Sequence, residues 1–438
     1  MRQRHTMQDN SYDVVVAGAG CGGICAAVQA ARQGARVLLV ERAALVGGTG
    51  IHSPVALICK FQRRDTLEPI NRGLHQELFP HAYAWRGEFD DHDMLPTYDH
   101  ADLAERYDML LESAPGLQLC TSCAVTDVEL ETHADGQRIS AVHLSDGSRV
   151  ACLVAVDGTA DGNLSALAGA SFHLGRPEDG AMQSATLTFG LRGFDVAGLR
   201  NPALTTWGGF RSLNQELDDV RRQERGEQAG HDRFGTGCFA YPDGRTLLFN
   251  ANHVTGVDPT RPETVARGLS EARALVDRSV ALVRRHPAFA NSELAFVSSW
   301  LGVREGRRIV GDHILTADEC LGEARFEDVV AAGAYDIDIH DPEGGPAHMQ
   351  RIPNTQYYHI PYRSLRARGL ANLLLASRCL SGDFVAHSSY RVMSCITAVG
   401  QAAGCAAALA VGQGGEVRAV DPIAIRRALA EAGQWVED

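Results

Sequence analysis

Three glycines near the start of the chain have the spacing that lets a backbone turn approach a phosphate group. Gly18, Gly20 and Gly23 form a G-x-G-x-x-G motif, and Glu41 ends the apolar run that follows. The first glycine of such a motif permits a tight turn, the second lets backbone N–H groups approach a pyrophosphate, and the third allows close helix–strand packing. A carboxylate at the position of Glu41 accepts hydrogen bonds from a ribose 2′-OH. These residues therefore predict a dinucleotide site.

The sequence around the motif predicts the β-α-β unit that such a site requires. Residues 12–17 form a continuous apolar run typical of a buried parallel strand, residues 24–33 have helical periodicity, and residues 36–40 predict a second parallel strand. The N-terminus of the helix supplies the partial positive charge that favours a phosphate. Because the motif lies in this full context, a glycine-rich turn without a nucleotide is the less favoured interpretation.

Later segments predict the remaining elements. An alternating pattern over residues 118–150 predicts a β-meander, and buried strands are expected at residues 151–156 and 371–376. Helices are expected over residues 102–113, 264–285, 392–409 and 422–432. No second G-x-G-x-x-G of comparable context follows, so the sequence predicts no dedicated NAD(P)H domain.

Composition limits the classes of partner. The chain has 438 residues, which suits two or three interleaved domains, and its net charge is -13. An acidic chain is a poor general partner for nucleic acids or anionic membranes, because phosphate-rich surfaces attract clustered cations. The N-terminus lacks the apolar segment of a signal peptide, and the apolar stretch 395–412 is interpreted as a buried core helix. We expect a cytoplasmic protein without a nucleic-acid or membrane partner, and its oligomeric state stays open.

Eleven cysteines are scattered along the chain, which suits a reducing compartment. Cys120 and Cys123 form a C-x-x-C pair in a strand-like stretch. No second pair and no histidine cluster completes a zinc site, so no metal site is predicted. The pair is interpreted as structural rather than redox-active, because a redox-active pair usually lies at a helix start.

Four blocks in chain order resemble a named family. They are VGGTG (46–50), VDGTADGNLSALAGASFHLGR (156–176), LGVREGRRIVGDHILTADE with AYDIDIHDP (301–319 and 334–342), and YHIPYRSL with the segment 372–410. Together they are similar to the FAD-dependent oxidoreductase family that includes many proteins labelled xanthan-lyase-like. The chain departs from the family pattern at Ala160, where glycine is usual in the second block, and at Ser377, where glycine is usual in the last.

This resemblance implies a fold class and a cofactor. The class is α/β, with a Rossmann-type FAD-binding domain of the glutathione-reductase-like flavoprotein class and an inserted mixed α+β substrate domain. The expected division gives residues 1–10 to a disordered tail and residues 413–438 to a C-terminal helix and tail. The FAD-binding domain would comprise residues 11–50, 101–171 and 366–412, and the substrate or cap domain residues 51–100 and 172–365.

The resemblance also implies which residues contact FAD. Gly47, Gly48 and Thr49 would line the pyrophosphate, and the backbone at Val125 would meet the adenine. Gly382 and Asp383 would approach the ribityl chain, and the helix start after Arg391 would face the flavin N1–O2 edge. The full set of expected cofactor-binding residues is Gly18, Gly20, Gly23, Glu41, Arg42, Gly48, Thr49, Val125, Asp161, Gly382, Asp383 and Arg391.

Five side chains are candidates for catalysis. His52 has an offset from Glu41 similar to that of the flavin-linked histidine of dimethylglycine and sarcosine dehydrogenases, which implies a covalent bond to FAD, an acid–base role or a simple loop contact. Lys60, the only lysine, is either an active-site amine or a surface residue. Arg304 belongs to an R-E-x-R-R cluster that suits either a carboxylate clamp or an internal ion-pair network. His340 and Arg391 complete the set.

The alternation of the segment 335–341 predicts that Asp336, Asp338 and His340 share one strand face, either as a metal-like trio or, more commonly, as a hydrogen-bonded domain joint. The leading hypothesis is an FAD-dependent oxidase or dehydrogenase for a small amine or hydroxy acid that bears a carboxylate. Oxygen or a separate electron carrier would reoxidise the flavin. The alternatives are a C=C reductase of the fumarate-reductase type, a dehydrogenase that binds NAD(H) without flavin, and a non-catalytic flavin-binding protein. The sequence does not name the substrate.

Overall fold

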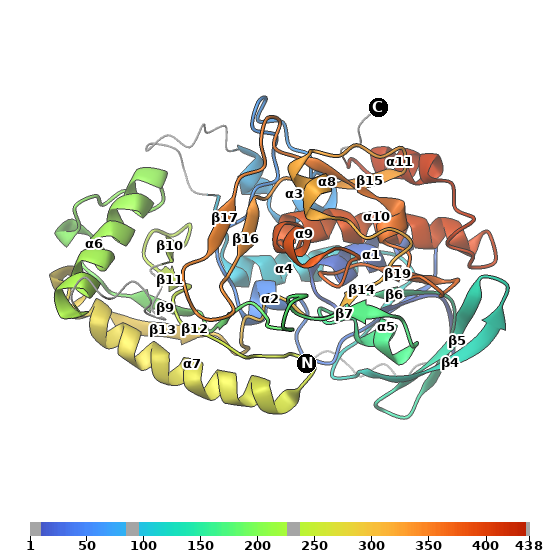
Figure 1. The fold of residues 1–438 in the computed structure, drawn as a ribbon, viewed down its shortest axis with the longest axis horizontal. Helices are drawn as coiled ribbons and strands as arrows, with labels where there is room; N and C mark the ends of the chain where they lie inside the picture. Colours follow the sequence, from blue (N-terminus) through green and yellow to red (C-terminus); the bar gives the residue numbers. More distant parts are fainter. Residues whose placement is uncertain (1–9, 85–95, 226–236, 435–438) are drawn as a thin grey trace.

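A seven-stranded sheet lies at the centre of the computed structural model, which describes residues 10–84, 96–225 and 237–434 (Figure 1). Its strands follow the order β3-β2-β1-β6-β5-β4, and β19 also pairs with β6. The parallel strands are β1 (Ser11–Ala17), β2 (Val37–Val40), β3 (Leu117–Cys120), β6 (Arg149–Asp157) and β19 (Leu373–Leu375). The antiparallel hairpin of β4 (Val125–His133) and β5 (Gly136–Leu144) completes the sheet. The predicted Rossmann-like α/β unit is confirmed. Of the expected disordered tail, residues 1–9 lie outside the described residues.

Two long helices pack against each other beside this sheet. They are α1 (Cys21–Arg32), which follows the glycine turn, and α10 (Met393–Val411) (Figure 1). Glycines let their backbones touch, because a Cβ atom on Gly400 would lie 2.2 Å from the Gly22 carbonyl oxygen, and one on Gly404 would lie 2.4 Å from that of Ala26. The alanine- and glycine-rich composition of both helices therefore serves close helix–helix contact.

The apolar character of α10 is explained by its burial. Within the described residues it is the one helix that is long and apolar enough to cross a membrane, and 83% of its most apolar window is buried inside the protein. The expectation of a buried core helix at this position agrees with the structure.

A second hydrophobic core surrounds a smaller sheet of order β10-β11-β9-β13. Its strands are β9 (Phe189–Arg192), β10 (Cys238–Ala240), β11 (Leu247–Phe249) and β13 (Glu293–Val297). Apolar side chains of α6 (Trp207–Arg225) and α7 (Pro262–Val283) belong to the same core. Ile309, Leu315 and Ile360, which were expected in the substrate domain, instead contribute to the core of the larger sheet. The division into domains stays a prediction.

The rest of the described chain contains further helices and short strands. The remaining helices are α2 (Thr49–His52), α3 (Leu74–Leu78), α4 (His100–Glu112), α5 (Asn163–Leu167), α8 (Ala317–Leu321), α9 (Phe384–Tyr390) and α11 (Pro422–Glu431). The remaining strands are β7 (Phe172–His173), β8 (Ala185–Thr186), β12 (His253–Val254), β14 (Arg308–Ile309), β15 (Val329–Gly333), β16 (Ile337–Ile339), β17 (His348–Gln350) and β18 (Tyr358–Pro361). The four helices expected from periodicity are confirmed as α4, α7, α10 and α11.

The contact between α1 and α10 gives a stability prediction. Alanine in place of a mid-helix glycine would ordinarily stabilise a helix by about 0.5–1 kcal/mol. At Gly404, however, the added methyl would meet the Ala26 carbonyl oxygen at 2.4 Å, so G404A is expected to destabilise the fold by about 1–3 kcal/mol. The matched control is G412A at the end of the same helix, where the new Cβ meets its nearest atom at an ordinary 3.5 Å. Urea midpoints measure both variants, and equal midpoints would contradict the packing argument.

Candidate functional site

The glycine turn between β1 and α1 has room for a ligand at one of its three motif positions. A Cβ atom on Gly23 would lie 1.9 Å from the Gly18 carbonyl oxygen, whereas one on Gly20 would meet nothing within 4 Å. Gly20 is also the N-cap residue of α1, and no side chain caps this end of the helix. An open approach beside uncapped backbone N–H groups fits the pyrophosphate of a dinucleotide.

Glu41 holds the glycine turn in place from the end of β2. Its two carboxylate oxygens accept hydrogen bonds of 2.8 Å from the backbone N–H groups of Ala19 and Ala43. Glu41 is buried, and each oxygen keeps a second lone pair for a ribose hydroxyl. The carboxylate thus shapes the phosphate turn and lies at the expected ribose position.

The second glycine loop packs directly on the first. Gly48 has a φ of 53°, and a Cβ atom on it would lie 3.0 Å from the Gly20 Cα. The N–H of Gly47 donates to the Ala19 carbonyl oxygen at 2.7 Å. Thr49 then begins the short helix α2. The two loops that were expected to surround the pyrophosphate are therefore in contact.

The loops after β6 and β19 form the other side of this turn. A Cβ atom on Gly22 would lie 1.9 Å from the Ala376 carbonyl oxygen, and Arg378, two residues later, donates to Asp161 at 2.7 Å. Arg378 also lies near enough to Cys21, the first residue of α1, to act on its pKa, which burial raises to about 12 and Arg378 lowers in part. Sequence reasoning missed Arg378, although it directly follows the carboxyl end of a buried strand, where ligands of parallel sheets bind.

Asp383 has a structural task in addition to any ligand contact. It is the N-cap residue of α9, where its carboxylate accepts from Ala386 N–H at 2.7 Å and from Ala317 N–H at 2.8 Å. A Cβ atom on Gly382 would lie 2.5 Å from the ring of Tyr390. The two residues are thus fixed between α8 and α9, and their expected contact with the ribityl chain stays a proposal.

Val125 and Arg42 lie at the start of β4 and just after β2, respectively. The neighbour of Val125, Ala124, donates its N–H to the Ser145 hydroxyl at 3.0 Å, which fixes the chain beside Glu41. The guanidinium of Arg42 lies 5.4 Å from the centre of the Trp300 ring, a cation–π distance. Arg42 is therefore held by the segment before β14 rather than by the glycine turn.

Three of the catalytic candidates converge on Asp338. Arg391 donates to the Asp338 carbonyl oxygen at 2.9 Å and lies 3.6 Å from its carboxylate, and His340 Nε2 lies 3.5 Å from the same carboxylate. Burial and then the charge of Arg391 lower the pKa of Arg304 to about 9, and Asp338 raises it in part, so Arg304 lies within electrostatic reach of both. Arg304 donates to the Ser184 carbonyl oxygen. We name Arg304, Asp338, His340 and Arg391 the arginine–histidine cluster.

The two histidines beside these arginines are neutral at pH 7. Burial and then Arg304 lower the pKa of His340 to about 4. His253 of β12 stacks on His340 with 5.2 Å between ring centres, and burial followed by Arg304 lowers its pKa to about 2. Although burial alone would raise the pKa of Asp338, His340 and Arg391 lower it overall. With His253 beside it, the cluster therefore combines two cations, one anion and two neutral imidazoles.

His253 and the position of Asp336 were not foreseen. His253 lies far from the other members in the sequence, and nothing local marks it. The expectation that all three side chains share one strand face is wrong, because β16 spans only Ile337–Ile339 and Asp336 precedes it. Asp336 instead accepts from Ile352 N–H at 2.9 Å and from Gln356 at 2.8 Å.

The R-E-x-R-R segment separates into two environments. Arg304 joins the arginine–histidine cluster, whereas Arg308 is buried 3.7 Å from Glu305. Arg307 donates to the Asp161 carbonyl oxygen at 2.9 Å. The internal network thus applies to Arg307 and Arg308, and the carboxylate clamp stays a prediction for Arg304.

His52 and Lys60 lie apart from that cluster. His52 is stacked on Trp300 with 3.9 Å between ring centres, and its Nδ1 and Nε2 lie 3.2 Å from the Ser299 hydroxyl and the Leu45 carbonyl oxygen. Lys60 is half-buried and donates to Gln356. Burial, followed by the nearby Arg64, lowers the pKa of Lys60 to about 8.

Comparison with known families gives a match over most of the chain. A family model described as FAD dependent oxidoreductase matches residues 13–429. NADH:fumarate oxidoreductase of Klebsiella pneumoniae (strain 342) is 39% identical over 70 residues, which is 15% of this chain and 8% of that protein. The chain thus spans less than a tenth of this curated relative.

Solved structures with related arrangements are more distant. GidA of Aquifex aeolicus is 13% identical, with 93% of this chain and 64% of that one covered and a TM-score of 0.46. A geranylgeranyl bacteriochlorophyll reductase-like protein of Thermoplasma acidophilum is 11% identical, with 96% and 83% covered and a TM-score of 0.44.

Lys60 predicts a pH dependence of stability. Its pKa falls from 10.5 in the unfolded chain to about 8 in the folded one, so the unfolded chain binds more protons between these two values. Lys60 therefore opposes folding fully below pH 8, and this effect disappears as pH rises towards 10.5. The stability of K60M relative to the natural chain should fall over that window, as measured by urea unfolding at successive pH values. K60R stays charged throughout this window, so its stability relative to the natural chain should fall in the same way as that of K60M. Parallel profiles for K60M and the natural chain would contradict the assignment.

Proposed function

Because the chain belongs to the FAD-dependent oxidoreductase family, we propose that it is an oxidase or dehydrogenase for a small amine or hydroxy acid that bears a carboxylate. The protein is an enzyme, and FAD is its cofactor. The observation that carries the choice of substrate is a pair of buried guanidinium groups beside one carboxylate: Arg391 lies 3.6 Å from Asp338, and Arg304 is near enough for both groups to act on its pKa.

The charge of the arginine–histidine cluster favours an anionic substrate. Arg304 and Arg391 are cationic and Asp338 is anionic at pH 7, while burial keeps His253 and His340 neutral. The cluster thus carries one positive charge in excess. Buried Arg391 Nε has no hydrogen-bond partner among the described residues, and a buried charged donor favours a ligand that supplies one. A substrate carboxylate would balance the charge and accept from the planar guanidinium fork.

His340 is the proposed proton acceptor. Its imidazole is neutral, and its Nε2 faces Asp338, which would stabilise the imidazolium that forms when a substrate hydroxyl or amine loses its proton. Among the described residues, Nδ1 of His340 makes no hydrogen bond of its own. FAD, when bound, supplies the acceptor for the hydride equivalent that leaves the substrate carbon.

The backbone N–H groups around Gly20 would bind the pyrophosphate of FAD, and Glu41 would bind its ribose. Gly48 and Thr49 would lie beside these groups. Arg378 is added to the set because it is the cation nearest the first turn of α1. The N-terminus of α10, which no side chain caps, would face the flavin N1–O2 edge.

Finer features of the protein remain proposals as well. We propose a glutathione-reductase-like arrangement in which the second hydrophobic core, around β9 and α7, belongs to an inserted substrate domain. We also propose a cytoplasmic location and reoxidation by oxygen or a separate carrier. Covalent attachment of FAD to His52 receives no support from the geometry, because both ring nitrogens lie at hydrogen-bond distance from other groups.

A C=C reductase is the second candidate, and the relative named NADH:fumarate oxidoreductase favours it. The same arginine pair would bind the carboxylate of an enoate. The two reactions differ in direction, so anaerobically reduced enzyme separates them. Rapid oxidation by fumarate with slow oxidation by oxygen would favour the reductase, and bleaching of the oxidised enzyme by a hydroxy acid or amino acid would favour the dehydrogenase.

The carboxylate proposal predicts the effect of removing Arg304. Once anaerobic flavin bleaching has identified a substrate, R304M should lower kcat/KM by about ten- to a hundredfold, because a hydrogen bond to a charged group contributes about 1.5–3 kcal/mol. For the methyl ester of the same substrate, R304M should lower kcat/KM much less. R304K keeps the positive charge but lacks the planar guanidinium, so its kcat/KM should lie between those of the natural enzyme and R304M. R192M, an exposed position on β9, is the control. An equal loss for acid and ester would rule out a carboxylate contact at Arg304.

The surroundings of His52 predict that FAD is bound without a covalent bond. Attack on the flavin 8α carbon needs a free imidazole lone pair, whereas Nε2 lies 3.2 Å from the Leu45 carbonyl oxygen and Nδ1 lies 3.2 Å from the Ser299 hydroxyl. Acid precipitation should therefore leave the yellow colour in the supernatant. The H52A variant should behave in the same way, and colour retained by the natural chain but lost from H52A would overturn the prediction.

A further inference from the structure

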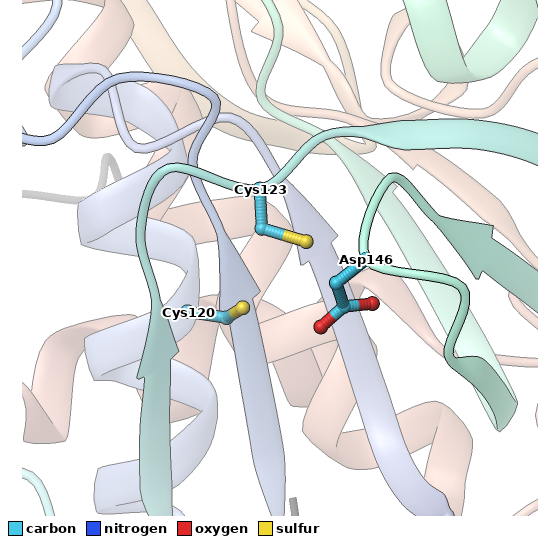
Figure 2. A group of neighbouring side chains, drawn as sticks. All are labelled: Cys120, Cys123 and Asp146. Carbon is cyan, nitrogen blue, oxygen red and sulfur yellow. The ribbon is translucent and has the colours of Figure 1, made fainter. Parts of the chain in front are cut away.

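Three potential metal ligands meet at the edge of the central sheet beside Glu41. Cys120 ends β3, Cys123 lies in the loop before β4, and Asp146 lies in the turn between β5 and β6 (Figure 2). The two Sγ atoms and a carboxylate oxygen all lie within 4.8 Å of one another. Cys123 is buried, Cys120 is half-buried and Asp146 is exposed, so the group is accessible to solvent from one side.

We propose that Cys120, Cys123 and Asp146 bind one thiophilic divalent cation of the Zn²⁺ class. Two thiolates at C-x-x-C spacing and one carboxylate are ligand types that Zn²⁺ accepts, and they would leave the fourth tetrahedral position to water. The sequence contains no second cysteine pair or histidine cluster that would signal the site. The third ligand comes from a hairpin turn that only the fold brings to the pair.

Backbone hydrogen bonds hold the cysteine loop in place without using the ligand atoms. Glu41 N–H donates to the Cys120 carbonyl oxygen at 2.8 Å, and Cys123 N–H donates to the Glu41 carbonyl oxygen at 3.0 Å. Ser122 N–H donates to the Ala43 carbonyl oxygen at 2.9 Å. The loop therefore needs little rearrangement to bind, which lowers the ordering cost of association.

The turn that carries Asp146 is joined to the same loop. Ser145 accepts a hydrogen bond of 3.0 Å from Ala124 N–H, and its hydroxyl lies 3.7 Å from the Cys123 sulfur. Asp146 accepts from Ser148 N–H at 2.9 Å through Oδ1. No ion pair involves Asp146 within the part of the chain that the structure describes, so a cation would meet no competing positive group on this ligand.

A second group of three potential metal ligands is a poorer candidate for a cation site. His133, Asp135 and Glu416 also lie within reach of one ion, but Arg138 donates to the Glu416 carboxylate at 2.9 Å. A guanidinium in direct contact repels a metal cation and already neutralises the carboxylate. This group is therefore not proposed as a site, and Asp135 supplies a matched control for an exposed acidic ligand.

The position of the proposed site gives it a structural consequence. A cation there would join β3, the loop before β4 and the β5–β6 turn, all of which border Glu41 and Val125 at the proposed adenosine end. It would not touch the arginine–histidine cluster, so the site is independent of the substrate and of the direction of the redox reaction.

Cadmium binding to the reduced, FAD-loaded full-length protein tests the proposal. Cd²⁺ should produce a saturable thiolate-to-metal absorption with one equivalent, and Zn²⁺ should displace it. The C120S/C123S double variant should lose the signal. D146N should weaken binding by at least about tenfold, the size of effect seen even for partners outside the coordination sphere. D135N should bind as the natural chain does.

The controls separate a metal site from other uses of the two thiols. Each variant must retain its FAD and its unfolding midpoint. In the natural chain, a thiol reagent should detect two fewer reactive thiols with metal bound than without it. Equal binding by the double variant would overturn the proposal. So would a Cys120–Cys123 disulfide that persists under mild reduction and prevents any binding.

Discussion

Direct contact between backbone atoms around the first turn of α1 is the constraint on which the arrangement of the larger sheet depends. The turn after β1 meets the loop after β6 at Gly158, the loop after β19 at Ala376 and the helix α10 at Gly400. Side chains at Gly22, Gly23 or Gly400 would have to occupy space that neighbouring backbone already fills. Segments from the beginning, middle and end of the chain therefore share one point, and the uncapped end of α1 opens beside it.

The substrate side depends on charge rather than on close packing. Arg304 precedes β14, Asp338 and His340 lie in or next to β16, and Arg391 lies between α9 and α10. Asp338 offsets part of the repulsion between the two guanidinium groups, and both neighbouring imidazoles stay neutral. An anionic ligand would relieve the repulsion between the two guanidinium groups, which is the basis of the proposed preference for a carboxylate.

The sequence predicted the dinucleotide side better than the substrate side, and the reason is physical. Gly18, Gly20, Gly23 and Glu41 act within one β-α-β unit, so their spacing alone defines their relative positions. His253 and Arg304 meet only through tertiary packing, which no periodicity encodes. Asp336 was misplaced because the alternation rule holds only within a strand, and β16 begins one residue after it. The helices were well predicted because burial of one face imposes a long, regular pattern.

Lys60 also determines how the protein reacts with amine-directed reagents. It is the only lysine of the chain, so the protein has a single ε-amine. With its pKa lowered to about 8, a sizeable share of that amine is uncharged and nucleophilic under mildly alkaline conditions. Apart from the N-terminal α-amine, simple aldehydes that form Schiff bases with many lysines in most proteins would here find one half-buried nitrogen. Arginine, which stands in place of lysine elsewhere in the chain, does not form such Schiff bases.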